Sequence, residues 1–257
     1  MIVPPVTAMY GVAIVPHRPY SRGRLGPSHP RVLSTADEQK AGSEPVFTGI
    51  VQDLCEVLAV DRVAGVGTLT IDLGSLANGL KLGASVATNG TCLTVTEIDG
   101  PRVCFEVISE TFSSTNLGSV AVGDRVNIER SLRFGDEIGG HVLSGHVADT
   151  VTVQAIESEG DNCTMWFDVE PSHMRYLFWK GFVALDGASL TISFLDRETN
   201  RLAVSLIPET LTRTTLGRVE VGQKVNLEID AQTQAIVGTV QEALRDPEMR
   251  TQFLEID

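Results

Sequence analysis

The chain has 257 residues, of which 42% are hydrophobic and 21% charged, and its formal net charge at pH 7 is −13. This composition is typical of a globular protein of one large domain or two ordinary ones, and no apolar run approaches the roughly 20 residues of a membrane-spanning helix. The acidic surplus argues against a nucleic-acid partner, because phosphate backbones require a basic surface.

Residues 1–46 differ in composition from the rest of the chain. They contain four arginines and no acidic residue before Asp37, and the prolines of PHRPYSRGRLGPSHPR (16–31) preclude a regular helix or strand. Three interpretations stay open: a disordered tail, an arginine-rich transit peptide, or an artefact of gene calling in which Val46 is the true start. We expect a cytoplasmic location, or a plastid if the transit peptide is real.

From residue 47 onward, the chain repeats the same segments in the same order. The nearly constant offset of about 97 residues indicates one duplicated domain, with a boundary near residue 142. The matching pairs are FTGIV (47–51) and LSGHV (143–147), NGTCLT (89–94) and DGASLT (186–191), ISETFSSTNLG (108–118) and IPETLTRTTLG (207–217), and VGDRVNIE (122–129) and VGQKVNLE (221–228).

Each repeat has the pattern of short β-strands. VCFEV (103–107) and RLAVSLI (201–207) alternate apolar and polar residues, while SVATNG (85–90) and VALDG (183–187) run into Asn-Gly and Asp-Gly turns. Six or so short strands in about 95 residues predict one small closed barrel per repeat. We therefore predict an all-β fold of two tandem, similar six-stranded antiparallel β-barrels.

The end of the chain has the pattern of a helix instead. We assign residues 47–142 to the first barrel, 143–231 to the second and 232–257 to a C-terminal α-helix. This helix carries one apolar stripe at helical spacing, which suits either subunit association or docking onto the second barrel. The stripe consists of Ile236, Val237, Val240 and Leu244.

The four cysteines fit neither a metal site nor a disulfide framework. Their spacings contain no CxxC pair and no zinc pattern, and a chain of this length builds its core without disulfides. We interpret them as reduced thiols and expect no metal site. They are Cys55, Cys92, Cys104 and Cys163.

Seven segments of the two repeats stand in register with one known family. They are FTGIVQ, NGTCLTVTEI, SETFSSTNLG, VNIERSLRFGDEIGGHVLSGHV, KGFVALDGASLT, LIPETLTRTTLG and VNLEIDAQTQAIV. From Phe47 to about Arg245, the chain resembles the alpha-type riboflavin synthase family. That family usually begins Met-Phe-Thr-Gly, whereas Val46 precedes Phe47 here.

The resemblance implies a reaction between two copies of one substrate. Two molecules of 6,7-dimethyl-8-ribityllumazine would meet between the first barrel of one subunit and the second barrel of its neighbour. A four-carbon unit would pass from one to the other, giving riboflavin and 5-amino-6-(ribitylamino)uracil. The resemblance further implies a homotrimer joined through the C-terminal helices, no cofactor, and an association with lumazine synthase.

Catalytic residues are expected where the resemblance and the repeat coincide. Cys92 and Ser189 follow the two glycine turns, and Thr191 shares a strand face with Ser189. Cys92 is a polar contact, a nucleophile or simply a buried thiol. His146 suits proton transfer, with a structural role as the alternative. Asp230 belongs either to the second site or to the N-cap of the helix.

The resemblance assigns a larger set of residues to substrate binding. Lys180 has Gly83 as its counterpart, and this asymmetry marks a residue that one site needs and the other does not. We expect His141 to be structural. The expected binding residues are Phe47, Gly49, Ile50, Val51, Leu93, Thr94, Glu106, Ser109, Glu110, Thr111, Gly145, Val147, Lys180, Leu190, Leu206, Ile207, Pro208, Glu209 and Thr210.

Lumazine and flavin antenna proteins, which bind without catalysis, resemble the same family and provide the alternative function. Their second barrel loses its polar residues, whereas this chain retains Ser189, Thr191, Lys180 and His146. The sequence therefore favours the enzyme. A purely structural tandem barrel is a third alternative, and it predicts no lumazine binding.

Overall fold

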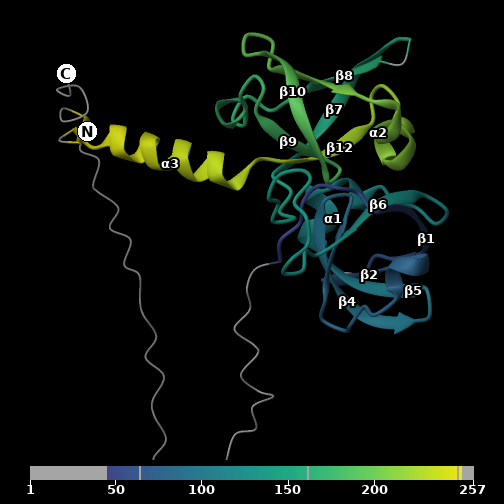
Figure 1. The fold of residues 1–257 in the computed structure, drawn as a ribbon. Coiled ribbons are helices and arrows are strands. Elements are labelled where there is room, and N and C mark those ends of the chain that lie inside the picture. The colour runs from purple at the N-terminus through teal and green to yellow at the C-terminus, as the bar shows by residue number, and fades with distance from the viewer. Residues whose placement is uncertain (1–44, 64, 161, 248, 251–257) are drawn as a thin grey trace, which may run out of the picture. The chain divides into compact units, whose positions relative to one another are not determined.

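Twelve β-strands in the described part of the chain form two closed antiparallel barrels of the same topology (Figure 1). A helix, α3 (Ala231–Arg245), follows the second barrel. The predicted fold class is confirmed. The computed structural model describes residues 45–63, 65–160, 162–247 and 249–250.

Two predicted segments fall partly outside the described residues. The N-terminal extension is described only at its last two residues, and residues 251–257 of the C-terminal segment are not described. Among the described helices, none is long and apolar enough to cross a membrane.

The first barrel closes in the order β1-β2-β5-β4-β3-β6, with β6 pairing back onto β1. A short helix, α1 (Ser109–Ser114), follows β5, and 3₁₀ turns lie at Gly74–Ala77 and Asn116–Gly118. The strands are β1 (Asp53–Asp61), β2 (Val66–Asp72), β3 (Ser85–Thr88), β4 (Thr91–Asp99), β5 (Arg102–Ile108) and β6 (Arg125–Arg130).

The second barrel repeats this order as β7-β8-β11-β10-β9-β12. Its helix α2 (Pro208–Arg213) occupies the place of α1, and 3₁₀ turns lie at Met174–Tyr176 and Thr215–Gly217. The strands are β7 (Asp149–Glu159), β8 (Asn162–Asp168), β9 (Phe182–Leu185), β10 (Ala188–Asp196), β11 (Arg201–Leu206) and β12 (Lys224–Glu228).

Each barrel encloses its own apolar core. Successive side chains of a strand point to opposite faces, so alternate residues fill the interior and the others face outward. Phe105 and Ile128 are fully buried in the first core, as are Phe167 and Leu185 in the second. The outward faces are therefore free to carry polar side chains for binding.

Two tight turns bring the barrels together. Asn89 and Gly90 join β3 to β4 with φ of 44° and 76°, while Asp186 and Gly187 join β9 to β10 with φ of 46° and 77°. These positive angles explain the Asn-Gly and Asp-Gly sequences. A Cβ atom added to Gly90 would lie 2.6 Å from the Gly187 nitrogen, so glycine lets the two turns touch.

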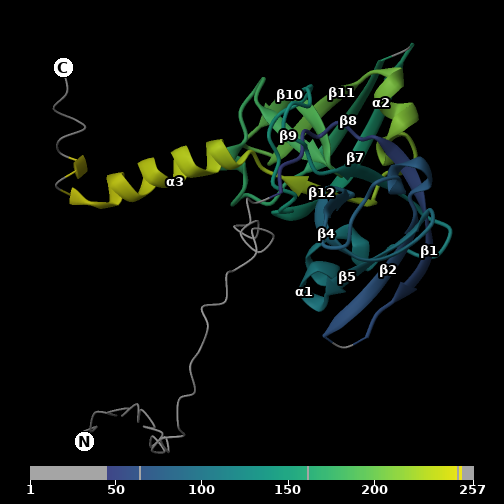
Figure 2. The same cartoon turned by 60° about the horizontal axis from the view of Figure 1, so that its bottom comes forward.

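Helix α3 begins at a well-formed N-cap and buries none of its residues. The Asp230 carboxylate accepts hydrogen bonds from the Thr233 backbone N–H, at 2.8 Å, and from its hydroxyl, at 2.6 Å. In both views α3 comes after β12 and runs as one unbroken helix (Figure 2). Its apolar stripe includes Ile236, which is 65% exposed.

Candidate functional site

The segments that open the two repeats, residues 47–51 and 143–147, pair with each other between the barrels; we call them the opening segments. Phe47 and Leu143 form an antiparallel bridge with two backbone hydrogen bonds of 2.9 Å. The next residues then reach opposite barrels. The Gly145 carbonyl accepts the Cys92 N–H at 2.9 Å, and the Gly49 carbonyl accepts the Ser189 N–H at 2.8 Å.

Each predicted site is therefore composite. The site around Cys92 combines the outer face of the first barrel with residues 143–147, and the site around Ser189 combines the second barrel with residues 47–51. Backbone hydrogen bonds fix both junctions. We call the two composite sites the Cys92 site and the Ser189 site.

The Cys92 site lies on the outward face of β4 and β5. Leu93 is buried in the first core, so its neighbours Cys92 and Thr94 turn outward. Glu106 of β5 is paired with Thr94 in the sheet and is exposed. Three predicted site residues thus share one face, whereas Leu93 presents only its backbone there.

The Cys92 thiol is kept protonated by its surroundings. Burial raises its pKa above the ordinary 9.0, and the neighbouring Ser85 side chain opposes this shift only in part. The nearby Glu228 carboxylate raises the pKa further. At neutral pH the group is a thiol and not a thiolate, which favours polar contact over nucleophilic attack.

His146 belongs to the Cys92 site, although it opens the second repeat. It follows Gly145 directly, its backbone N–H lies 3.3 Å from the Ser144 hydroxyl oxygen, and its side chain is exposed. Val147 continues the segment as a half-buried neighbour. Because its backbone adjoins Cys92 of β4 and its side chain is exposed, His146 stays a candidate for proton exchange with a bound molecule.

The Ser189 site contains an imidazole that sequence reasoning assigned to structure alone. Nδ1 of His141 lies 2.7 Å from the Ser189 hydroxyl oxygen, and the ring stacks on Phe182 with centroids 5.0 Å apart. Burial lowers the pKa of His141, while the Asp230 carboxylate opposes that shift. The neutral imidazole is able to accept the Ser189 proton, so His141 joins the candidate site.

The polar face of β10 continues beyond Ser189. Thr191 is exposed on the same face, and the half-buried Leu190 packs against the second core. Ile50 and Val51 follow Gly49 beside this face, and Ile50 is 49% exposed. Ile50 thus offers an apolar surface at the position where the Cys92 site has His146.

Lys180 adopts a backbone conformation that favours glycine. Its φ is 64°, close to the 77° of its counterpart Gly83 in the first repeat. A lysine here carries conformational strain of about 1 kcal/mol. Its ammonium lies 5.5 Å from the centre of the Trp179 ring. The turn itself requires this conformation, since the Lys180 N–H donates to the Ile192 carbonyl at 3.0 Å, as the Gly83 N–H does to Val95 at 2.8 Å. The backbone does not explain a lysine in place of glycine, so Lys180 stays a candidate binding residue.

Other predicted binding residues lie where the barrel strands end and α1 and α2 begin. Ser109, Glu110 and Thr111 form the first turn of α1, and Pro208, Glu209 and Thr210 that of α2, after the exposed Ile207. These segments occupy equivalent places in the two barrels. Phe47 and Leu206, in contrast, are almost fully buried, at 1% and 2% exposure.

Sequence reasoning also missed two buried carboxylates that hold the opening segments. Glu129 accepts hydrogen bonds from Thr48 and Gly49, and Glu228 accepts them from Ser144 and Gly145. The available signal was the same glutamate at the end of VNIE and VNLE in the two repeats. A repeated charge at the end of a buried strand indicates a partner inside the protein.

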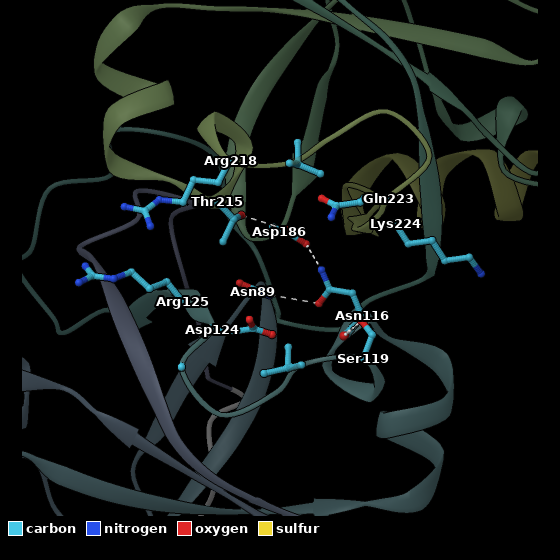
Figure 3. A pocket seen from close by; sticks show the side chains of 13 residues that line it. Asn89, Asn116, Ser119, Asp124, Arg125, Asp186, Thr215, Arg218, Gln223 and Lys224 are labelled. Carbon is cyan, nitrogen blue, oxygen red and sulfur yellow. Dashed lines mark hydrogen bonds between the residues drawn. The ribbon is translucent and has the colours of Figure 1, made fainter.

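A cavity of about 710 Å³ between the barrels contains none of the predicted site residues (Figure 3). Part of its wall is a polar network centred on Asp186, which accepts hydrogen bonds from the Asn116 amide, the Thr215 hydroxyl and the Asn226 N–H. Burial raises the pKa of Asp186 to about 6. With its partners satisfied inside the protein, this network joins the barrels and we do not assign the reaction to it.

Within the described residues, no cluster of His, Cys, Asp and Glu side chains has the arrangement of a metal site. The described side chains at or beside the two sites offer hydroxyl, thiol, imidazole, carboxylate and ammonium groups. Two barrels of one topology, each with a polar outer face completed by the other repeat, define the class: a duplicated barrel that binds small molecules.

Comparison with known proteins identifies this class more closely. The lumazine binding domain family matches residues 48–131 and 144–230, one match per barrel. The riboflavin synthase of Escherichia coli (strain K12) is 48% identical over 201 residues, which are 77% of this chain and 93% of the relative. That of Chlamydia pneumoniae is 42% identical over 200 residues, 77% and 97% of the two chains. The chain belongs to the riboflavin synthase family.

Solved structures share the fold. A structure of LumP complexed with 6,7-dimethyl-8-(1'-D-ribityl) lumazine superposes with a TM-score of 0.64 at 24% identity, over 72% of this chain and 99% of that one. LumP complexed with riboflavin gives a TM-score of 0.65. At this identity the likeness establishes the tandem-barrel architecture alone.

Proposed function

We propose that this chain is a riboflavin synthase, which converts two molecules of 6,7-dimethyl-8-ribityllumazine into riboflavin and 5-amino-6-(ribitylamino)uracil. The observation that carries the proposal is the pair of equivalent but chemically different composite sites, in a chain whose relatives bear that name. A reaction between two copies of one substrate needs two similar sites with different roles. Duplication followed by divergence supplies them.

The proposed chemistry needs a base and close alignment of two rings. One lumazine loses a proton from its 7-methyl group, and the resulting carbanion attacks the other lumazine. His146 at the Cys92 site and the His141–Ser189 pair at the other site are the candidate proton acceptors. Each such group contributes about 10²–10⁴-fold, and holding the two rings in contact contributes more.

The antenna alternative is disfavoured by the second barrel. An antenna function needs one binding site, whereas here both composite sites carry polar groups in equivalent places. Ser189, Thr191 and Lys180 line or adjoin the second site, and His141 contacts Ser189 directly. The polar character of both barrels supports the enzyme.

A homotrimer joined through α3 is part of the proposal. Ile236, Val240 and Leu244 are 65%, 47% and 45% exposed, so the described barrels leave the apolar stripe uncovered. Light scattering after size exclusion should give three chains per particle, and Ile236→Asp with Val240→Asp should give monomers. A wild-type monomer would contradict the trimer. Association with lumazine synthase stays a prediction for co-purification.

Turnover of the lumazine is the direct test. Flavin-free protein should produce one riboflavin for every two lumazines consumed, without added cofactor. His146→Gln should lower kcat by about 10²-fold, because it removes a proton acceptor. His173→Gln is the matched control, since His173 pairs with Asp149 in the second barrel. Tight binding without turnover would instead support the antenna function.

A further inference from the structure

Glu129 fixes the opening segment of the first repeat through both of its carboxylate oxygens. Oε1 accepts the Thr48 N–H at 2.6 Å and the Thr48 hydroxyl at 2.7 Å, while Oε2 accepts the Gly49 N–H at 2.9 Å. The side chain is buried, and burial raises its pKa against the effect of these three donors. Charge-assisted hydrogen bonds of this kind are about twice as strong as neutral ones.

Glu228 holds the opening segment of the second repeat with a different distribution of bonds. Oε1 alone accepts the Ser144 N–H at 2.8 Å, the Ser144 hydroxyl at 3.0 Å and the Gly145 N–H at 3.1 Å. Oε2 is buried and has no hydrogen-bond partner in the described part of the chain. The two glutamates are therefore equivalent in position but not in bonding.

Each held segment borders the site of the opposite barrel. The Gly49 carbonyl accepts a hydrogen bond from the Ser189 N–H, and the Gly145 carbonyl accepts one from the Cys92 N–H. The approach is tight, because a Cβ on Gly49 would lie 2.5 Å from the Ser189 Cβ and one on Gly145 would lie 2.6 Å from the Cys92 Cβ. A small shift of either segment must therefore move the reacting face beside it.

We propose that Glu129 and Glu228 are positioning residues that act across the barrels: Glu129 sets the Ser189 site and Glu228 sets the Cys92 site. Neither carboxylate is assigned to contact with the substrate. Each anchors the backbone that delivers Ile50 or His146 to the other barrel's face. For its kinetic readout, this inference rests on the proposed function.

The unequal bonding predicts an unequal response to the isosteric amide. In Glu228→Gln the amide oxygen can keep all three bonds at the Oε1 position, and the amide nitrogen takes the place of the unpartnered Oε2. In Glu129→Gln one donor must face another donor, at Gly49 or at Thr48, because both oxygens accept. Glutamine thus preserves one anchor and breaks the other.

Steady-state kinetics on the full chain tests this asymmetry. Glu129→Gln should lower kcat/KM by about tenfold or more, and Glu228→Gln should stay within about twofold of wild type. Glu228→Ala removes all three hydrogen bonds of Glu228 and should lower kcat/KM about as much as Glu129→Gln does. The exposed Glu97→Gln is the matched control. Equal losses for the two glutamine variants, or an unimpaired Glu129→Gln, would overturn the proposal.

Thiol labelling gives a site-resolved readout that does not need catalysis. The rate at which iodoacetamide modifies Cys92, assigned by peptide mass, should change several-fold more in Glu228→Ala than in Glu228→Gln, because both variants remove the charge that raises the Cys92 pKa but only alanine removes the hydrogen bonds. The rate should stay constant in Glu129→Ala. In a Ser189→Cys background, the new thiol should respond to Glu129→Ala and not to Glu228→Ala. If either alanine variant changed the labelling of both thiols equally, crossed positioning would be contradicted.

The two readouts separate the failure of this inference from the failure of the proposed function. If wild type makes no riboflavin but the labelling pattern is crossed, the glutamates position the sites of a non-catalytic binder. If Glu129→Gln does not fold, Thr48→Val replaces it, because it removes the hydroxyl donor to Glu129 and keeps both backbone donors. It also removes the acceptor of the Ile50 N–H within the same opening segment. That variant should still change labelling at position 189 and leave Cys92 unaffected.

Discussion

The two barrels share a backbone and differ in the side chains on their outer faces. Strand order, glycine turns and buried glutamates are the same in both. The residues at the sites differ in pairs: Cys92 and Ser189, His146 and Ile50, Lys180 and Gly83. Features inside a barrel must preserve the packing of its neighbours, whereas an outward side chain diverges at little cost to stability. Duplication therefore conserves the scaffold and permits two roles.

The joint between the barrels shows the same division. Asn127 and Asn226 occupy equivalent places and each donates to the opposite turn, to the Asp186 and Asn89 carbonyls, both at 2.8 Å. The turns themselves differ, with Asn89 in one and Asp186 in the other. Only the aspartate introduces a buried titratable group. The backbone contacts of the two barrels are thus symmetric, whereas the titratable groups in their turns are not. Four substitutions test how far the two barrels are equivalent.

The largest effect is expected at the crossed junction. Gly49→Ala should lower the free energy of unfolding by more than about 3 kcal/mol, because φ of +74° is unfavourable and the new Cβ would meet the Ser189 Cβ at 2.5 Å. Gly123→Ala is the control: it has φ of +91° with nothing within 4 Å, and should cost about 1–2 kcal/mol. Chemical denaturation measures both free energies of unfolding. Equal losses in the two variants would show that the close contact of Gly49 with Ser189 does not contribute to stability.

Making the two turns alike is expected to have the next largest effect. The pKa of Asp186 rises from 3.8 to about 6 on folding, so its contribution to stability is present below pH 3.8 and is lost as pH rises through 6. The stability of wild type relative to Asp186→Asn should therefore fall by up to about 3 kcal/mol between pH 4 and pH 7. Urea denaturation across this range tests the sign, and a difference that rises with pH would contradict it.

Making the two site residues alike should have a smaller effect. Cys92→Ser gives the first site the hydroxyl of the second, and the thiol it removes is protonated at neutral pH because burial raises its pKa. We expect kcat/KM to stay within about fivefold of wild type. A loss of more than about 10²-fold in riboflavin formation would show that Cys92 acts as a nucleophile.

The smallest effect is expected on the barrel surface. Arg213 and Glu209 form an exposed ion pair one turn apart on α2, whereas α1 has Ser114 in place of the arginine. Arg213→Ser should change the free energy of unfolding by less than about 0.5 kcal/mol, because solvent screens exposed pairs. A loss above 1 kcal/mol in thermal or chemical denaturation would show that this helix is coupled to the barrel core.

The sequence was sufficient for the architecture because the duplication made every local signal appear twice. Alternating strands and paired glycine turns predicted two barrels, and the seven segments predicted the family. The stripe on 232–257 predicted a helix, and the structure begins it at Ala231 after the Asp230 cap. Local periodicity and turn chemistry act over a few residues, so they can be read without coordinates.

Only the tertiary structure decided which residues share a site. Sequence order places His146 in the second repeat, yet the Gly145–Cys92 hydrogen bond puts it beside the first barrel. The same crossing brings His141 to Ser189 and makes Glu129 and Glu228 anchors for opposite faces. Such contacts join residues some 50 to 140 positions apart through backbone geometry, and a linear pattern carries no record of them. The sequence determined the parts of each barrel, and packing between the barrels decided how two sites are made from them.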